Sequence, residues 1–247
     1  MKDMAKLKNS ARKRLRTIYN FFLDLKPRKS FVPSYSQMLN EIRQQALQRS
    51  PTNDHLVTLF IESLIMRPKL IVELGVARGG STFVFERVGQ LTAAEIISVD
   101  IKDCSNASSY KDWIFIHKDD IEFAGEFKEW CIKKNIEPKI DILFIDTSHY
   151  YGHTVQEIAN YFPLLSDKAK VFFHDTNLGN FFFRKDGSLD LGWDNERGVI
   201  RALEDYFHKS FNEKEAFIDI IDGWLIKHDP FCNGLTILEK IALPPGR

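Results

Sequence analysis

The sequence predicts an α/β fold in which a doubly wound, mostly parallel, seven-stranded sheet is covered by helices on both faces. From residue 56 onward, short apolar runs alternate with segments of helical periodicity, which is the pattern of repeated strand–helix units. The first apolar run leads into a glycine-rich turn, ELGVARGGST over residues 73–82, and several later runs end in an acid. Such residues at strand ends are typical of a parallel sheet with a ligand site along one edge.

The expected elements follow one another in a regular order from residue 55 to residue 240. Helices are expected at His55–Met66, Ser81–Gln90, Ala124–Lys134, Thr154–Phe162 and Asn195–His208. Parallel strands are expected at Leu70–Leu74, Glu95–Asp100, Trp113–Ile116, Ile140–Asp146 and Ala169–Asp175. Two final runs are expected as edge strands, namely Phe217–Ile221 with Trp224–Lys227, and Leu235–Lys240.

The first 55 residues differ from the rest, and we expect them to form a helical cap or extension (1–55) ahead of the main domain (56–247). Their apolar residues fall at helical spacing in two groups, separated by Pro27 and Pro33. The groups are Leu15, Ile18, Tyr19, Phe22 and Leu25, then Met38, Leu39, Ile42, Ala46 and Leu47. Ten Lys and Arg lie within the first 30 residues. The segment either packs on the main domain or a partner subunit, which would give a homo-oligomer, or it serves as an arm for a polyanion or membrane.

Bulk composition excludes several classes of protein. Hydrophobic residues make up 44% of the 247 residues, and Lys plus Arg equals Asp plus Glu at 34 each, so no overall charge favours nucleic acid. The three cysteines are scattered without a C-x-x-C pair, which argues against disulfides and a thiolate zinc site. No apolar run approaches the ~18 residues of a membrane span, and the start lacks a secretory apolar core, so we expect a cytoplasmic protein.

The turn after the first strand carries the strongest cofactor signal. A dinucleotide fingerprint, G-x-G-x-x-G, needs a glycine where this chain has Ala77, because the pyrophosphate approaches the backbone there. Glu73 stands two residues before Gly75. The loop therefore favours a cofactor without phosphates, whose cationic or amino-acid end an acidic residue can help to hold.

Acids at three successive strand ends outline an adenosine-shaped site. Glu73 closes the first strand, and Asp100 closes the second, where it is placed to accept hydrogen bonds from both ribose hydroxyls. After the third strand, Asp119 or Asp120 could meet an adenine amino group. Each acid alone could instead cap the next helix, so the ordered set is the stronger signal.

Strands four and five end in residues of a different kind. Asp146 and Asp175 could reach one metal ion from neighbouring strands, and carboxylate oxygens suit Mg²⁺, although both could be plain caps. His149 could take a hydroxyl proton as general base, whereas His153 fits a place at the start of its helix. His174 either joins the metal ligands or points away from Asp175, because neighbours on a strand face opposite sides.

The segment Gly179–Trp193 is rich in Phe with interspersed Gly. It is either an ordered loop that borders the acceptor pocket or a surface hairpin with buried Phe side chains.

Over about residues 56–240 the chain resembles a class I S-adenosylmethionine-dependent methyltransferase, with a Rossmann-like sheet. The resemblance rests on five motifs in order, ELGVARGGST, ISVD, HKDD, FIDTSHYYGHT and FFHDTN. More narrowly, the chain is similar to the group that includes macrocin-type and mycinamicin-type sugar O-methyltransferases and cephalosporin-hydroxylase-like proteins. The first 55 residues carry no matching motif.

The resemblance implies a role for each of the singled-out residues. The methionine end of the cofactor would be held by Glu73, Gly75, Gly79 and Ser81, the ribose by Asp100, and the adenine by Asp119 or its rival Asp120. Metal-dependent members use an aspartate that corresponds to Asp146 and an acidic pair that corresponds to His174 and Asp175, so His174 departs from the pattern and leaves Mg²⁺ open. Some members place a catalytic histidine at the position of His149.

We therefore expect an O-methyltransferase that uses S-adenosylmethionine to methylate a hydroxyl of a sugar or small metabolite. One alternative is a catalytically inactive methyltransferase-like protein that serves in binding or assembly. The other is an NAD-linked oxidoreductase, against which Ala77 and the early Glu73 argue.

Overall fold

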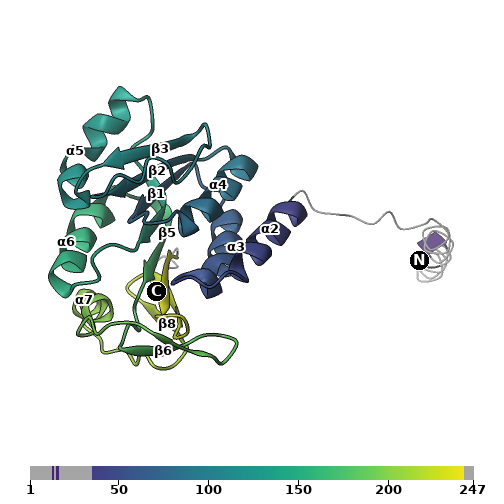
Figure 1. Ribbon diagram of the computed structural model, residues 1–247. Coiled ribbons are helices and arrows are strands. Elements are labelled where there is room, and N and C mark those ends of the chain that lie inside the picture. Colours follow the sequence, from purple (N-terminus) through teal and green to yellow (C-terminus); the bar gives the residue numbers. More distant parts are fainter. Residues whose placement is uncertain (1–12, 14, 17–34, 242–247) are drawn as a thin grey trace, which may run out of the picture. The chain divides into compact units, whose positions relative to one another are not determined.

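The computed structural model describes residues 13, 15–16 and 35–241 of the chain (Figure 1). The chain divides into two compact units, Met1–Ser36 and Gln37–Arg247, and the second contains the whole sheet. The first predicted helix, around residues 15–25, falls almost entirely outside the described residues. The second predicted helix is present as α2 (Ser36–Ala46).

The main unit alternates strands and helices in the predicted order. Its helices are α3 (Leu56–Met66), α4 (Gly80–Thr92), α5 (Asp120–Lys133), α6 (Tyr151–Tyr161) and α7 (Gly198–Phe207). Its parallel strands are β1 (Leu70–Leu74), β2 (Glu95–Asp100), β3 (Trp113–His117), β4 (Ile140–Ile145) and β5 (Leu165–His174). The later strands are β6 (Phe181–Phe183), β7 (Leu189–Leu191), β8 (Phe217–Ile221), β9 (Trp224–Asp229) and β10 (Leu235–Lys240).

The central sheet has eight strands in the order β3-β2-β1-β4-β5-β10-β9-β8, so the prediction of seven is wrong. The runs 217–221 and 224–227 belong to two separate antiparallel strands, because Asp222 and Gly223 turn the chain at φ 48° and 81°. The expectation that 235–240 is an edge strand is also wrong. This run, β10, pairs with both β5 and β9, and its first four residues are buried.

The two faces of the sheet carry separate hydrophobic cores. Alternation along β1 sends Leu70, Val72 and Leu74 into a core shared with α5, α6 and α7. Ile71 faces the other core, which α2, α3 and α4 cover. Figure 1 shows these two groups of helices on opposite sides of the strands. The doubly wound arrangement is therefore confirmed, and the carboxyl ends of β1 to β5 meet along one edge.

Helix α2 belongs to the second core, although it lies in the segment predicted as a cap. Ile42 is fully buried, and Met38, Leu39 and Ala46 pack around it. The Arg87 guanidinium of α4 donates to the Glu41 carboxylate at 3.2 Å. The compact unit that holds the sheet thus begins near residue 37, ahead of the predicted boundary at residue 56.

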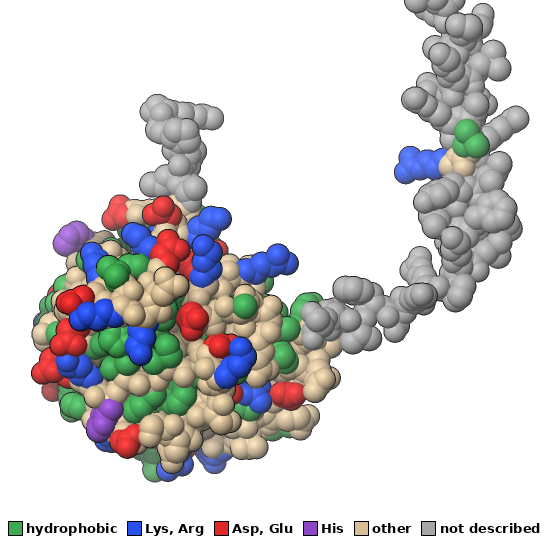
Figure 2. All heavy atoms as spheres, turned by 90° about the horizontal axis from the view of Figure 1, so that it is seen from above, with side chains coloured by type: hydrophobic (Ala, Val, Ile, Leu, Met, Phe, Trp, Pro, Cys, Tyr) green, Lys and Arg blue, Asp and Glu red, His purple; other side chains and the backbone are tan. Residues whose placement is uncertain are grey.

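The described surface carries charges of both signs. Figure 2 shows Lys and Arg side chains interspersed with Asp and Glu on the face that it presents, with hydrophobic side chains between them. Among the described residues, no helix combines the length and apolar character that crossing a membrane requires.

Candidate functional site

A cavity of about 1040 Å³ opens along the edge where the parallel strands end. The strand order reverses between β1 and β4, and a reversal of this kind is where open α/β sheets bind ligands. Residues after β1, β2 and β3 line one side of the cavity, and residues after β4 and β5 line the other. Most of the predicted site residues are among them, namely Gly75, Asp100, Asp119, Asp120, Asp146, His149 and Asp175.

The loop after β1 is held in a shape that only particular residues permit. Gly75 adopts a φ of +85°, and a Cβ there would lie 2.0 Å from the backbone oxygen of Asp146. Gly79 is the N-cap of α4 at φ +75°. Ala77, at the position where a dinucleotide fingerprint has glycine, takes a left-handed φ of 47° and lines the cavity. The glycines therefore serve the loop's geometry and the close approach of β4.

Asp100 shapes this loop as well as facing the cavity. Its Oδ2 accepts from the backbone N–H groups of Val76 at 2.8 Å and Ala77 at 3.1 Å, and its Oδ1 accepts from Lys102 N at 2.8 Å. Partial burial would raise the pKa of Asp100, but the backbone donors outweigh burial and lower it. The lowered pKa favours the ionised carboxylate, which lines the cavity at the end of β2.

Glu73 and Ser81 do not line the cavity, in contrast to the role that the resemblance implied for them. Glu73 is fully buried and faces α4, since the alternation of side chains along β1 puts it on the same face as Ile71. Its carboxylate accepts hydrogen bonds from Ser81 Oγ at 2.6 Å and Thr82 Oγ1 at 2.8 Å, and from Ser98 Oγ. Burial nevertheless raises the pKa of Glu73 to about 7. Its task here is to join β1, β2 and α4.

The two adjacent aspartates after β3 have different surroundings. Asp119 is the N-cap of α5, and its Oδ1 accepts from the backbone N–H groups of Ile121 at 3.0 Å and Glu122 at 3.1 Å. Asp120 turns toward α6, where His153 Nε2 lies 3.0 Å from its Oδ1. Both residues line the cavity, so the predicted choice between them for adenine stays open.

A group of ionisable side chains lines the cavity at the carboxyl ends of β4 and β5. His149 Nε2 lies 3.2 Å from Asp175 Oδ2, and His149 Nδ1 lies 3.9 Å from Asp146 Oδ1. The loop that carries His149 has a left-handed φ of 61° at this residue and is supported from α7. Asn195 Nδ2 donates to the His149 carbonyl at 3.2 Å, and a Cβ at Gly198 would lie 2.4 Å from that oxygen.

His174 is buried behind this group and does not line the cavity. Its Nδ1 donates to Asp146 Oδ1 at 3.1 Å and lies 3.2 Å from Asp175 Oδ1. Asp175 reaches the same side as His174 because its φ of 57° leaves the extended conformation of the strand. Burial would lower the pKa of His174, but the charges of Asp175 and Asp146 outweigh it and raise that pKa well above its ordinary value.

Asp146 and Asp175 together with His149 form a set of ligand atoms that suits a divalent ion. Asp146, His149 and Asp175 each offer a ligand atom, and these atoms all lie within 4.8 Å of one another. Asp175 Oδ1 is buried beside His174 Nδ1 at 3.2 Å but accepts no hydrogen bond from the described residues. The predicted set of Asp146, His174 and Asp175 differs from this group, because His174 Nδ1 faces both carboxylates and donates to Asp146 Oδ1.

The Phe-rich segment combines the two forms predicted for it. β6 and β7 form a hairpin in which Phe182 is buried, and Phe182, Asp190 and Trp193 line the cavity. Arg184 is buried and pairs with Asp190, and its Nη1 also donates to Ser50 O at 2.9 Å. The hairpin is therefore an ordered wall of the cavity, fixed to the segment before α3.

Sequence reasoning missed several lining residues in the segments that border this wall. They include Arg49, Ser50, Arg184, Asp190 and Asn233. Arg49 and Arg184 both contact Asp190, from positions more than 130 residues apart along the chain. No local pattern marks such a long-range pairing; the one available signal was the density of aromatic and glycine residues around them.

The comparisons with known proteins agree with this geometry. Residues 72–176 match the sequence profile of a family described as "Methyltransferase domain". A comparison with curated proteins returned no match.

Solved structures share the fold at low sequence identity. The SAH-bound methyltransferase PaMTH1 of Podospora anserina is 15% identical with a TM-score of 0.51, and the alignment covers 92% of this chain and 96% of that chain. A methyltransferase from Geobacter sulfurreducens is 13% identical with a TM-score of 0.50 over 92% and 97% of the two chains. MycE from the mycinamycin biosynthetic pathway, in complex with Mg and SAH, is 18% identical with a TM-score of 0.51 over 83% of this chain and 56% of that chain.

The matched segment spans β1 to the residues after β5, which is the part of the sheet that builds the cavity. Residues 72–176 therefore form a methyltransferase domain, and the chain shares the fold of methyltransferases that have been crystallised with SAH.

Proposed function

We propose that the protein is an O-methyltransferase that transfers a methyl group from S-adenosylmethionine to a hydroxyl of a sugar or other small metabolite. The observation that carries the proposal is the His149–Asp175 pair, which faces the same cavity as Asp100 and the loop at Gly75. An imidazole held by a carboxylate is suited to accept a proton from an acceptor hydroxyl.

S-adenosylmethionine, when bound, supplies an electrophilic methyl group on sulfur. Asp100, Gly75 and Ala77 line the part of the cavity where the cofactor's ribose and amino-acid end would lie. Because Nε2 of His149 faces Asp175, the acceptor proton would go to Nδ1, directly or through a water. A lone pair of the acceptor oxygen would then form the new C–O bond, and the C–S electrons would remain on sulfur. Asp175, whose pKa is lowered by His174 despite its burial, stays ionised and stabilises the imidazolium. The enzyme's further contribution is to align the two reactants and exclude water.

Mg²⁺ assistance is a separate part of the proposal. Asp146 and Asp175 would hold the ion through carboxylate oxygens, with His149 close enough to act as the base beside it. Such an ion would make an acceptor hydroxyl more acidic. Turnover of protein treated with EDTA, before and after Mg²⁺ is restored, measures this contribution. Unchanged turnover in EDTA would remove the metal from the proposal and leave His149 as the base.

The residues that line the cavity around Trp193 favour a sugar or another ring-shaped acceptor. The Trp193 ring lies 5.9 Å from the His149 ring between centroids and is 40% exposed, so part of it is accessible to a ligand. Asp190, Arg49 and Asn233 supply polar groups to the lining of the same cavity. An aromatic ring beside several hydrogen-bonding groups fits a polar ring with one apolar face.

Two substitutions separate cofactor binding from chemistry. Asp100→Ala removes a charged acceptor and the support of the loop, so SAH affinity should fall about 10- to 100-fold, as expected for hydrogen bonds to a charged group. His149→Ala should reduce kcat by about 10²- to 10⁴-fold, the usual contribution of a general base, and should leave SAH affinity nearly unchanged. Titration calorimetry with SAH and methyl-transfer assays on a panel of hydroxylated acceptors measure both effects. Absence of SAH binding to the wild type would end the proposal, and binding without transfer to any acceptor would favour the inactive alternative.

A further inference from the structure

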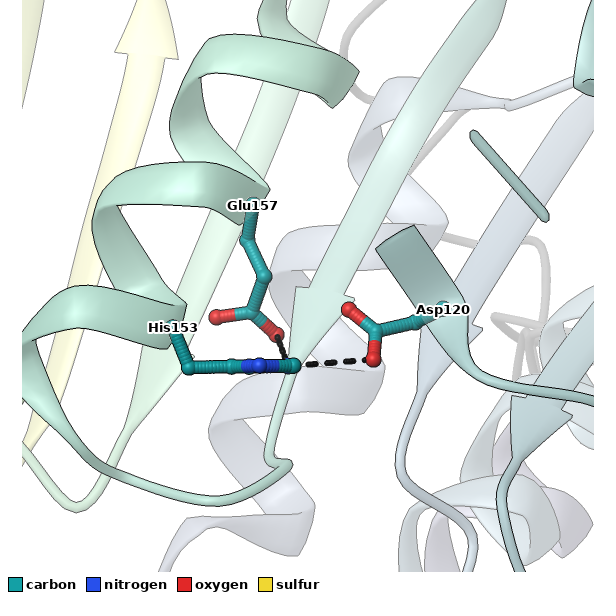
Figure 3. A group of neighbouring side chains, drawn as sticks. All are labelled: Asp120, His153 and Glu157. Atoms are coloured by element: carbon teal, nitrogen blue, oxygen red, sulfur yellow. Dashed lines mark hydrogen bonds and ion pairs between the residues drawn. The ribbon is translucent and has the colours of Figure 1, made fainter. Parts of the chain in front are cut away.

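A second cluster of potential metal ligands lies apart from the group formed by Asp146, His149 and Asp175, which is called the Asp146 group below. Asp120 at the start of α5 and the pair His153 and Glu157 on α6 converge on one point, as Figure 3 shows. His153 Nε2 lies 3.0 Å from Asp120 Oδ1 and 3.8 Å from Glu157 Oε1. The ligand atoms of all three lie within 4.8 Å of one another. None of these residues belongs to the Asp146 group.

The cluster is buried and incompletely satisfied. The side chain of Glu157 is fully buried and that of Asp120 is 9% exposed. Asp120 Oδ2 and Glu157 Oε2 have no hydrogen-bond partner among the described residues. In Figure 3 the Asp120 carboxylate is turned toward Glu157 and the His153 ring edge. Two facing carboxylates in such surroundings require positive charge between them, because an unpaired buried charge is costly.

The surrounding structure fixes these side chains in place. Thr147 Oγ1 donates to Glu157 Oε1 at 2.6 Å, and Tyr161 Oη donates to the Asp120 carbonyl at 2.6 Å. His153 and Glu157 are four residues apart on α6 and therefore share one face of the helix. Asp120 and His153 also line the cavity, which gives a hydrated ion a path to the cluster.

We propose that Asp120, His153 and Glu157 form a second metal site, which binds a divalent first-row transition ion such as Zn²⁺ or Mn²⁺. One imidazole nitrogen and two carboxylate oxygens are a ligand set for these ions, whereas Ca²⁺ and Mg²⁺ favour oxygen ligands alone. Three protein ligands leave a coordination position that water can fill from the cavity side. The ion would join α5 to α6 beside the predicted adenine position.

The competing occupant is a proton. Burial raises the pKa of Glu157 to about 8, so a protonated Glu157 beside a His153 imidazolium would also balance the charge. A bound metal ion can be counted per protein molecule and scatters X-rays anomalously, whereas a proton does neither. Metal titration and crystallography therefore separate the two. The proposal does not depend on methyl transfer, and its test uses no activity assay.

The test is a titration of metal-free, full-length protein with Mn²⁺, followed by electron paramagnetic resonance, and with Zn²⁺, followed by elemental analysis after dialysis. Asp146→Asn is the parent, because it disables the other candidate site. The parent should retain one equivalent of ion. Glu157→Gln and His153→Gln, added singly to this parent, should each weaken binding by more than about 100-fold, beyond the effect of losing an outer partner. Glu126→Gln is the matched control, since this exposed α5 carboxylate contacts only Lys118 among the described residues, and it should bind as the parent does.

Two results would overturn the site. One is a parent that takes up no stoichiometric Mn²⁺ or Zn²⁺, and the other is a Glu157→Gln variant that binds either ion as tightly as the parent. If a variant fails to fold by circular dichroism, crystals of the wild type grown with ZnCl₂ decide the matter. An anomalous peak at the zinc edge among the three side chains supports the site, and its absence refutes the site.

Discussion

Glu73 has an environment that couples the stability of the protein to pH. The carboxylate is fully buried on β1 and accepts hydrogen bonds from three hydroxyl groups. Desolvation still dominates and raises its pKa from 4.5 to about 7. The folded protein therefore holds this proton to a higher pH than the unfolded chain does, and the side chain opposes folding as the pH rises.

Replacing Glu73 by Gln should remove this dependence. Between pH 4.5 and about 7 the unfolded chain loses the proton first, so the unfolding free energy of the wild type falls relative to that of Glu73→Gln. The difference should change by up to about 3 kcal/mol across this range. Urea unfolding of both proteins at pH 4.5, 6 and 8 measures it. Parallel pH profiles of the two proteins would show that Glu73 titrates normally.

Residue type and position predicted correctly that some of the proposed site residues face the cavity, but not that others are turned away from it. Asp100, Asp146, His149 and Asp175 lie at strand ends and face the cavity, as expected. Glu73 was predicted to hold the cofactor because it precedes the glycine turn, yet alternation on the strand points it into the α4 face. That information was present in the sequence, since Ile71 and Glu73 share one face and Leu70, Val72 and Leu74 share the other.

At the scale of elements, the turn between β1 and α4 depends on its first glycine. Gly75 N donates to Val99 O at 2.9 Å, and the residue lies against the backbone of Asp146, directly after β4. The positive φ and the backbone of Asp146 leave no space for a side chain. The same turn presents Ala77 to the cavity, so a disturbance here reaches the cofactor side of the site directly.

Gly75→Ala should therefore reduce the unfolding free energy by about 2–4 kcal/mol, from backbone strain and the displacement of β4. SAH affinity should fall with it. The matched control is Gly152→Ala on α6, where an added Cβ meets no atom within 4 Å. That change should be neutral or stabilise the helix by up to about 1 kcal/mol. Thermal unfolding and SAH titration of both variants test this pair; equal effects of the two would contradict the steric argument.

The hairpin of β6 and β7 illustrates how an element gains a role from distant partners. Its pattern predicted either a wall of the pocket or a surface hairpin, and it is a hairpin that lines the cavity. Its exposed face is apolar, with Phe181, Phe183, Leu189 and Leu191 all more than half exposed. Its inner face is fixed by Arg184, Asp190 and Arg49. The local sequence could indicate that side chains alternate between the two faces of the hairpin. It could not indicate which distant residues contact the inner face.

At the scale of the molecule, the basic segment and the sheet belong to different units of the chain. The compact unit that begins at Gln37 contains every described residue of the cavity, the first of which is Arg49. Ten of the chain's 34 Lys and Arg lie before residue 31, outside this unit. Cofactor binding and any assembly role of the N-terminal segment should therefore be separable by truncation.

Deleting residues 1–34 should leave SAH affinity within about twofold of the full chain, a difference well below 1 kcal/mol. The unfolding transition of the main unit should likewise stay unchanged, because the core contacts of α2 begin at Met38. Calorimetry and light scattering of the two proteins measure affinity and mass. A loss of affinity would mean that the N-terminal segment completes the site. A smaller number of subunits with unchanged affinity would assign the segment to assembly.

The sequence by itself determined the fold class, the order of the elements and the cofactor class, because these follow from local periodicity and from the glycine turn with its succession of acids. Only the tertiary structure decided the strand count, the inner position of β10 and the partners of each charged side chain. Strand pairing depends on contacts between segments far apart in the chain. The positions of His174 beside Asp146, of Arg49 beside Asp190 and of Glu157 beside Asp120 arise in the same way, when folding brings distant strand and helix ends to one edge of the sheet.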